Sequence, residues 1–210
     1  MSLGRTADVR VYLFTYRRNH LLPRALESLR RQSHENWICE VHNDDPDDPV
    51  PGQLVRELND SRFHYVQHAT NLGGTASFNL AFRPTAEPWV SVLEDDNWWE
   101  PELLQTLLAV LSARPDAPVA WANMWLWQEE ADGTWTRTGT VWPVAAAAPL
   151  TVFATRQPRQ VFGPLHSNGA MLVRSTHLHR YRLPEQTPFF AMEAIRDRRF
   201  EWPMVLVRQP

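Results

Sequence analysis

The first half of the chain alternates short apolar segments with segments of helical periodicity, and this rhythm restricts the fold more than any other feature. Strand-like composition, rich in β-branched and aromatic residues, occurs at 9–15, 37–42, 63–68 and 89–93. Helical spacing of apolar residues occurs at 21–32, 53–59, 75–82 and 102–112. Strands that alternate with helices form a parallel sheet covered by helices. We therefore expect an α/β fold with a mainly parallel central sheet flanked by helices.

The second half of the chain differs from the first in composition and in its pattern of expected elements. Residues 119–128 are apolar and rich in tryptophan, which predicts one long strand with Trp121, Trp125 and Trp127 in the core. The other expected elements are a hairpin turn at Asp132-Gly133, strands at 135–141 and 170–174, and a helix at 189–199. No internal repeat or linker divides the chain, so we expect a single domain over residues 1–210.

The composition excludes several classes of protein. The chain has 210 residues with 21 Lys+Arg, 24 Asp+Glu and a formal net charge of −3, so the basic surplus of a nucleic-acid-binding protein is absent. No apolar run approaches the roughly 18 residues of a membrane span. Cys39 is the only cysteine, which excludes an internal disulfide and fits a reducing compartment. These observations predict a cytoplasmic location, with a membrane-associated partner left open.

Polar and charged residues follow each strand of the first half. In open parallel sheets, ligands bind outside the carboxyl ends of the strands, so these residues are the candidates for a site. They are Thr15, Tyr16, Arg17 and Arg18 after the first strand, Asn43, Asp44 and Asp45 after the second, Asn71, Gly73 and Gly74 after the third, and Glu94, Asp95, Asp96 and Asn97 after the fourth.

Three consecutive carboxylates, Glu94, Asp95 and Asp96, follow the fourth strand. Their mutual repulsion is offset by a cation, and Mg²⁺ or Mn²⁺ is the natural candidate because hard divalent ions take oxygen ligands. The alternative is a solvated acidic loop ahead of a helix N-terminus. The aromatic ring and arginines after the first strand, with a carboxylate after the second, are suited to stack a base, hold phosphates and accept a hydrogen bond.

Five segments resemble one known family in the order in which that family carries them. They are FTYRRNHLLPRALESLRRQS, VHNDDPDD, NLGGTASFN, LEDDNWWEP and NGAMLVR. Together they are similar to family 2 glycosyltransferases with the GT-A fold, a Rossmann-like domain of the nucleotide-diphospho-sugar transferases. The resemblance runs from about Val9 to about Trp202 and implies a nucleotide-binding half at about 1–115 and an acceptor-binding half at about 116–210.

The resemblance implies transfer of a sugar from a nucleoside diphosphate sugar, with a uridine nucleotide expected, to a hydroxyl acceptor with inversion at the anomeric carbon. Tyr16 would stack on the base, Thr15 would contact the base or ribose, and Asp44 would hydrogen-bond the base. Asp96 would be the principal ligand of Mn²⁺ or Mg²⁺, with Asp95 near the metal or the ribose. The remaining residues expected to bind the nucleotide are Arg18 and Asn71.

Inversion in one displacement requires a general base on the acceptor hydroxyl. The resemblance places it at Asp197, with Glu193 as the second choice. The acceptor is a glycan, a lipid or a small molecule, and the oligomeric state is open. No Gln-x-x-Arg-Trp sequence is present, which favours non-processive transfer of a single sugar. Trp98 and Trp99 adjoin the acidic segment, where one could support a sugar ring and the other pack in the core.

The sequence departs from the family pattern at two positions, Asn43 and Glu94, where aspartate is usual. This leaves open a degenerate protein of the same fold that binds a nucleotide or glycan without turnover. A sugar-phosphate nucleotidyltransferase is a weaker alternative, because no Gly-rich phosphate loop follows the first strand. A dinucleotide-dependent dehydrogenase is weaker still, because G-x-G-x-x-G is absent.

Overall fold

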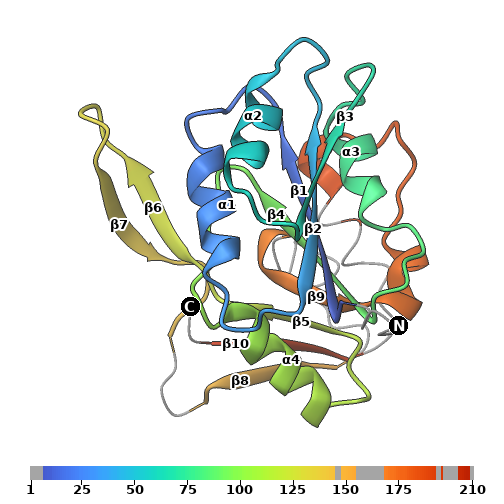
Figure 1. Ribbon diagram of the computed structural model, residues 1–210. Coiled ribbons are helices and arrows are strands. Elements are labelled where there is room, and N and C mark those ends of the chain that lie inside the picture. Colours follow the sequence, from blue (N-terminus) through green and yellow to red (C-terminus); the bar gives the residue numbers. More distant parts are fainter. Residues whose placement is uncertain (1–6, 145–147, 155–167, 193–194, 196–202, 209–210) are drawn as a thin grey trace.

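The computed structural model describes residues 7–144, 148–154, 168–192, 195 and 203–208. Figure 1 shows helices on both sides of a central sheet, with a separate hairpin of β6 (Trp125–Glu129) and β7 (Trp135–Thr140) projecting from it. The fold is α/β with a large, mainly parallel sheet, as the sequence predicts. In the described part of the chain, no helix combines the length and the apolar character needed to cross a bilayer.

The central sheet has eight strands among the described residues, in the order β3-β2-β1-β4-β9-β5-β10-β8. Its strands are β1 (Val9–Thr15), β2 (Trp37–Asn43), β3 (Phe63–Gln67), β4 (Trp89–Glu94), β5 (Val119–Ala122), β8 (Leu150–Phe153), β9 (Met171–Arg174) and β10 (Met204–Val207). The first four run parallel to one another. β9 is antiparallel to both β4 and β5, and β10 is parallel to β5 and antiparallel to β8.

Helices cover the two faces of the sheet unequally. One face packs against α1 (Leu22–Arg30), α2 (Val50–Glu57) and α4 (Leu103–Ala113), which bury their apolar sides in one core. The other face packs against α3 (Gly74–Leu80) and the short 3₁₀ helix η2 (Ser175–Arg180) in a second core. Alternate residues of β1 supply both cores, since successive side chains of a strand point to opposite faces.

The expected long strand over 119–128 is wrong, because β5 and β6 are separate strands in separate sheets. The break falls at Asn123, whose side-chain amide donates to the carbonyl of Trp142 at 2.7 Å and whose oxygen accepts from the Trp142 amide at 2.8 Å. Beyond this break the chain leaves the core. Trp121 is buried as expected, but Trp125 is only half-buried and Trp127 is 38% exposed.

Two further 3₁₀ turns complete the late part of the chain. They are η1 (Asn168–Ala170) and η3 (Phe189–Ala191). The expected helix at 189–199 therefore begins as a 3₁₀ turn, and most of the rest of that range lies outside the described residues. The hairpin predicted at Asp132-Gly133 is confirmed, with Gly133 at φ +81°, a left-handed conformation that glycine adopts without strain.

A buried ion pair joins β1 to the segment before β4. Arg10 donates from Nε to Glu87 at 2.7 Å and from Nη2 at 3.0 Å, and it also contacts Glu40 on β2. Burial opposes ionisation of Glu87 most strongly, but the hydrogen bonds from Arg10 and Thr85 outweigh it, so the pKa of Glu87 is lowered from 4.5. Through Arg10, the ionised pair connects β1 to β2 and to the segment that leads into β4.

We expect Glu87→Gln to lower the free energy of unfolding at pH 7 by about 1–3 kcal/mol, because Arg10 loses a charged partner. A carboxyl with a lowered folded pKa stabilises above its unfolded value, and this contribution is lost as the pH falls through the lowered pKa. The difference between variant and wild type should therefore shrink from pH 7 to pH 3 in urea titrations. Glu57→Gln, at an exposed position, is the control. An equal deficit at both pH values contradicts the assignment.

Candidate active site

All six residues expected to bind the nucleotide line one cavity of about 350 Å³ at the carboxyl ends of the strands. They are Thr15, Tyr16, Arg18, Asp44, Asn71 and Asp95. The strand register explains this meeting, since Thr15 pairs with Asn43 and Phe14 pairs with Glu94 across the two neighbours of β1. The turns after β1, β2 and β4 thus start at the same level of the sheet and converge.

The turn after β1 holds Tyr16 at the cavity. Arg17 has φ +57°, a left-handed conformation that is uncommon for a residue with a side chain. Its guanidinium bonds the Asp45 carboxylate at 2.7 Å and lies 4.9 Å from the Tyr16 ring centre. Thr15 is buried, whereas Tyr16 is 42% exposed. A strained turn clamped in this way presents an aromatic ring to a ligand without burying it first.

Asp44 is buried and holds the segment after β3 against β2. Its carboxylate accepts from His68 Nδ1 at 2.8 Å, from the Leu72 amide at 2.8 Å and from the Gly73 amide at 3.0 Å. Asn71 donates to the Asp44 carbonyl at 3.1 Å. A carboxylate has about four lone-pair positions, so three bonds leave it room for one further donor. The residue is thus both a brace for the cavity wall and an acceptor for one group of a ligand.

Arg18 lies between the two aspartates that follow β4. It bonds Asp95 Oδ1 at 3.3 Å and also contacts Asp96. Burial raises the pKa of Asp95 from 3.8, and neighbouring Asp96 acts in the same direction, against the opposing effects of Thr15 and Arg18. Asp95 also accepts from the Tyr16 amide at 3.3 Å. The cavity therefore holds a carboxylate whose charge is only partly compensated.

The residues present fit a divalent cation only together with ligand oxygens. No group of three His, Cys, Asp or Glu side chains with metal-binding geometry exists among the described residues. Asp95 and Asp96 supply two carboxylates, and Mg²⁺ often takes one or two carboxylates with substrate phosphates completing its shell. Arg18 occupies the position of a counter-charge to both. Glu94 is turned to another contact, accepting from Asn97 Nδ2 at 3.0 Å.

Several cavity residues escape prediction from the sequence. They are Ser77 and Phe78 of α3 and Phe189 of η3, whereas Gly74 is among the candidates named after the third strand. A Cβ on Gly74 would lie 2.3 Å from the Phe189 ring, so the glycine is what admits this ring. The Ser77 hydroxyl is buried and has no hydrogen-bond partner among the described residues, which leaves it free for a ligand. The sequence placed Ser77 and Phe78 only in an expected helix at 75–82, and nothing in it linked Phe189 to them.

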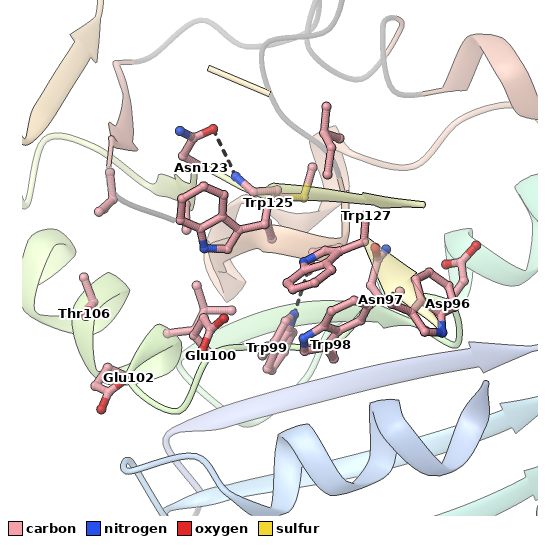
Figure 2. Close-up of a pocket in the computed structure, with 18 residues that line it drawn as sticks. Asp96, Asn97, Trp98, Trp99, Glu100, Glu102, Thr106, Asn123, Trp125 and Trp127 are labelled. Atoms are coloured by element: carbon pink, nitrogen blue, oxygen red, sulfur yellow. Dashed lines mark hydrogen bonds between the residues drawn. The ribbon is translucent and has the colours of Figure 1, made fainter. Parts of the chain in front are cut away.

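A second cavity, of about 410 Å³, is lined by Asp96 and Asn97 of the 94–97 loop, whereas Glu94 and Asp95 of the same loop line the first cavity. It lies between this loop, the start of α4 and the β6–β7 hairpin, and Figure 2 shows the rings of Trp98, Trp125 and Trp127 around it. Trp98 packs 5.5 Å from Trp127 and 5.9 Å from Trp135, measured between ring centres. We call this space the tryptophan cleft. Asp96 lines this cleft, and the preceding residue, Asp95, lines the first cavity.

The two tryptophans after the acidic segment divide their roles. Trp99 is buried and donates from Nε1 to the Gly169 carbonyl at 2.7 Å, which fixes η1 against β4. Trp98 lines the cleft, with the Arg24 guanidinium 3.9 Å from its ring centre. The two residues predicted to act as general base, Asp197 and Glu193, lie outside the described residues.

The sequence was then compared with known proteins. The profile of glycosyl transferase family 2 matches residues 11–165. The Escherichia coli (strain K12) protein WcaA, described as a colanic acid biosynthesis glycosyl transferase, is 30% identical over 102 residues, covering 48% of this chain and 37% of WcaA. The protein y4gI of Sinorhizobium fredii (strain NBRC 101917 / NGR234) is 28% identical over 105 residues, covering 49% of this chain and 12% of y4gI.

Solved structures share the fold at low identity. S. aureus TarS 1-349 superimposes with a TM-score of 0.75 and 16% identity, covering 97% of this chain and 58% of that chain. The mannosyltransferase PcManGT of Pyrobaculum calidifontis, in complex with GDP-Man and Mn²⁺, gives a TM-score of 0.60 and 14% identity, covering 91% of this chain and 51% of that chain. The chain thus spans about half the length of these structures. Its sequence match and its fold agree, and the chain belongs to glycosyl transferase family 2.

Proposed function

We propose that this chain transfers a sugar from a nucleoside diphosphate sugar, with uridine as the base, to a hydroxyl group of an acceptor, with inversion at the anomeric carbon. The observation that carries the proposal is the convergence of six nucleotide-binding candidates on one cavity at the strand ends. Structural relatives support it, because TarS has been crystallised with UDP and with UDP-GlcNAc. The relative with GDP-Man makes guanosine the base to test against uridine.

In this proposal the nucleotide lies between the turns after β1 and β2. Tyr16 stacks on the base, and the remaining acceptor position of Asp44 takes a hydrogen from it. Thr15 and Asn71 contact the base or the ribose. Arg18 leaves the aspartates and moves to the diphosphate, since a guanidinium binds phosphate with charged, bidentate hydrogen bonds.

Asp96, assisted by Asp95, would hold Mn²⁺ or Mg²⁺. A bound divalent ion stabilises the negative charge that develops on the leaving nucleoside diphosphate. The chain itself brings two carboxylates together beside the donor cavity. Burial and the repulsion between the two carboxylates make ionisation of Asp95 unfavourable, and its pKa is raised as a result. That cost favours any cation which takes the place of Arg18.

Inversion further needs a base that removes the proton of the acceptor hydroxyl while the bond from the anomeric carbon to the diphosphate oxygen breaks. We assign this role to Asp197, with Glu193 as the second choice. The acceptor enters through the tryptophan cleft, which is lined by Asp96, the neighbour in sequence of Asp95 in the donor cavity. Residues from about 116 onward then form the acceptor half of a single domain over 1–210. Transfer is non-processive, and the location we propose is cytoplasmic.

The competing proposal is a protein of the same fold that binds a nucleotide without turnover. The presence of Asn43 does not favour this alternative, because its side chain both donates and accepts hydrogen bonds, whereas an ionised aspartate only accepts them. Its Nδ2 donates to the Asp48 carbonyl at 2.8 Å, and its Oδ1 accepts from the Asp45 amide at 3.0 Å. Metal-dependent release of nucleoside diphosphate from a nucleotide sugar separates the two proposals. A nucleotidyltransferase would instead release pyrophosphate from a nucleoside triphosphate.

The first test is a thermal-shift titration with UDP and GDP, each with and without Mn²⁺. A ligand that binds only the folded state raises its melting temperature, so UDP with Mn²⁺ should give the largest shift. Asp96→Ala should abolish the Mn²⁺-dependent part and keep the rest. Asp116→Ala, at an exposed position after α4, is the control. An unchanged Mn²⁺-dependent shift in Asp96→Ala contradicts the metal assignment.

Asp95→Asn should stabilise the ligand-free protein by about 0.5–1 kcal/mol at pH 7 while weakening its response to UDP and Mn²⁺. The raised folded pKa means that folding favours the protonated carboxyl, so the charged form costs stability above that pKa. Asparagine removes the charge and can still accept from the Tyr16 amide. Urea unfolding at pH 7 measures the first effect. A destabilised variant would contradict this prediction, because it would show that the ion pair with Arg18 outweighs the cost of burying the charge.

Trp127→Ala should raise the KM for a carbohydrate acceptor at least about fivefold, because an aromatic face in a cleft binds the apolar face of a sugar. Hydrolysis of the donor by water and the affinity for UDP should change less than twofold. Gln128→Ala, on the next and exposed residue of β6, is the matched control. If the two variants had equal KM values for the acceptor, the proposal that the acceptor binds in this cleft would be wrong.

A further inference from the structure

A chain of buried hydrogen bonds leads from β2 to the carboxylate of Asp44. Glu40 Oε2 lies 3.1 Å from His42 Nε2, His42 Nδ1 lies 3.0 Å from His68 Nε2, and His68 Nδ1 lies 2.8 Å from Asp44 Oδ1. Both histidines are buried, at 2% and 7% exposure. We call these four residues the histidine chain. The donor site as described uses only its last member.

At the Glu40 end of the histidine chain, arginine side chains surround the carboxylate. Arg10 of β1 contacts Glu40, and Arg83, which follows α3, lies 4.0 Å from the same carboxylate. The rings of Tyr12 and Phe14 of β1 pack against His42 at 5.8 Å and 5.3 Å, and Glu87 bonds Arg10. Glu40 therefore has two arginines beside it.

The other end of the chain is different. The Asp44 carboxylate bonds the His68 imidazole and two backbone amides, and it forms no ion pair with an arginine or lysine of the described residues. A buried carboxylate without a counter-charge is costly.

The number of hydrogens fixes the charge of the two histidines. Each of the three contacts needs one hydrogen, and ionised carboxylates supply none. A neutral imidazole carries one N–H, so two neutral rings supply two hydrogens for three contacts. The third contact is satisfied only when one ring is an imidazolium. Glu40 already has two arginines beside it, whereas Asp44 has none among the described residues, so we place the additional proton on the ring next to Asp44, that of His68.

We propose that His68, held as an imidazolium between His42 and Asp44, is a positioning residue that keeps the 68–74 segment closed over the nucleotide cavity. The proposal rests on the proposed function, since it concerns the same cavity. The imidazolium compensates the Asp44 charge, and Asp44 in turn holds the amides of Leu72 and Gly73. When the proton leaves, the buried carboxylate loses its counter-charge and gains by turning to water, which opens the segment.

The direction of the pH effect follows from linkage. The closed segment binds one more proton than the open one, so closure is favoured at low pH and lost as the pH rises through the titration of the pair. Nucleotide affinity follows, because a nucleotide that meets an open segment must first order it. The range to examine is about pH 6 to 8.5, where imidazoles titrate.

The experiment compares wild type with His68→Asn, whose amide nitrogen can donate to Asp44 at the position of Nδ1 but does not titrate. ¹⁵N spectra of the histidine side chains report whether each ring nitrogen carries hydrogen. Hydrogen exchange, expressed as protection relative to the unstructured peptide, reports closure at the Leu72 and Gly73 amides. Calorimetry with UDP reports affinity. His64→Asn, at an exposed position of β3, is the control.

We expect one doubly protonated ring in the pair at pH 6 and its loss by pH 8.5. Over the same range the wild type should lose about five- to tenfold in protection at Leu72 and Gly73 and in UDP affinity, relative to His68→Asn. Comparison with the variant cancels the titration of the phosphate itself. Two neutral rings at pH 6, or parallel pH curves in the two proteins, overturn the proposal.

The two levels of inference fail separately. If UDP binds no form of the protein, the proposed donor is wrong, while the ring nitrogens and the two amides still decide whether His68 is charged and holds the segment. If UDP binds equally at every pH with the segment fully protected, the donor assignment stands and His68 is not the positioning residue.

Discussion

The pairing of β1 with parallel neighbours on both sides is the constraint on which the rest of this structure depends. β1 lies between β2 and β4, and its register with each brings Thr15, Asn43 and Glu94 to one level of the sheet. The turns that follow these strands must therefore share one edge. Buried apolar strands fix this register, because a slip of one residue would turn every core side chain to the opposite face.

That edge concentrates negative charge, and the structure compensates each carboxylate differently. Asp45 is paired with Arg17 at the surface, Asp95 and Asp96 share Arg18, and Asp44 is held by an imidazole and two amides. Beside Arg18, burial raises the pKa of Asp95. A cation is therefore favoured at this place, between Asp95 of the donor cavity and Asp96 of the tryptophan cleft.

The polar contacts inside the sheet continue to this edge without a gap. The ion pair of Arg10 with Glu87 contacts Glu40, and Glu40 begins the histidine chain that ends at Asp44. A buried network of this kind is favourable only when all members are satisfied. A continuous series of polar contacts thus connects the strands of the sheet to the wall of the cavity.

The sequence by itself determined the parallel half of the sheet, its helices and the six nucleotide-binding candidates that line the donor cavity. The periodicity of apolar residues predicts strands and helices. Because ligands bind at the carboxyl ends of parallel strands, the residues that follow each predicted strand could be named as candidates for a site. The sequence also determined the hairpin, since the dipeptide Asp132-Gly133 favours a tight turn with glycine in a left-handed conformation.

Only the tertiary structure decided the rest. The break at Asn123 depends on Trp142, and the place of Phe189 at the cavity depends on the absence of a side chain at Gly74. The contact between His68 and His42 joins two rings that are separated in the chain by a whole helix and strand. Such contacts join residues far apart in the chain through packing and hydrogen bonding, which no local pattern records.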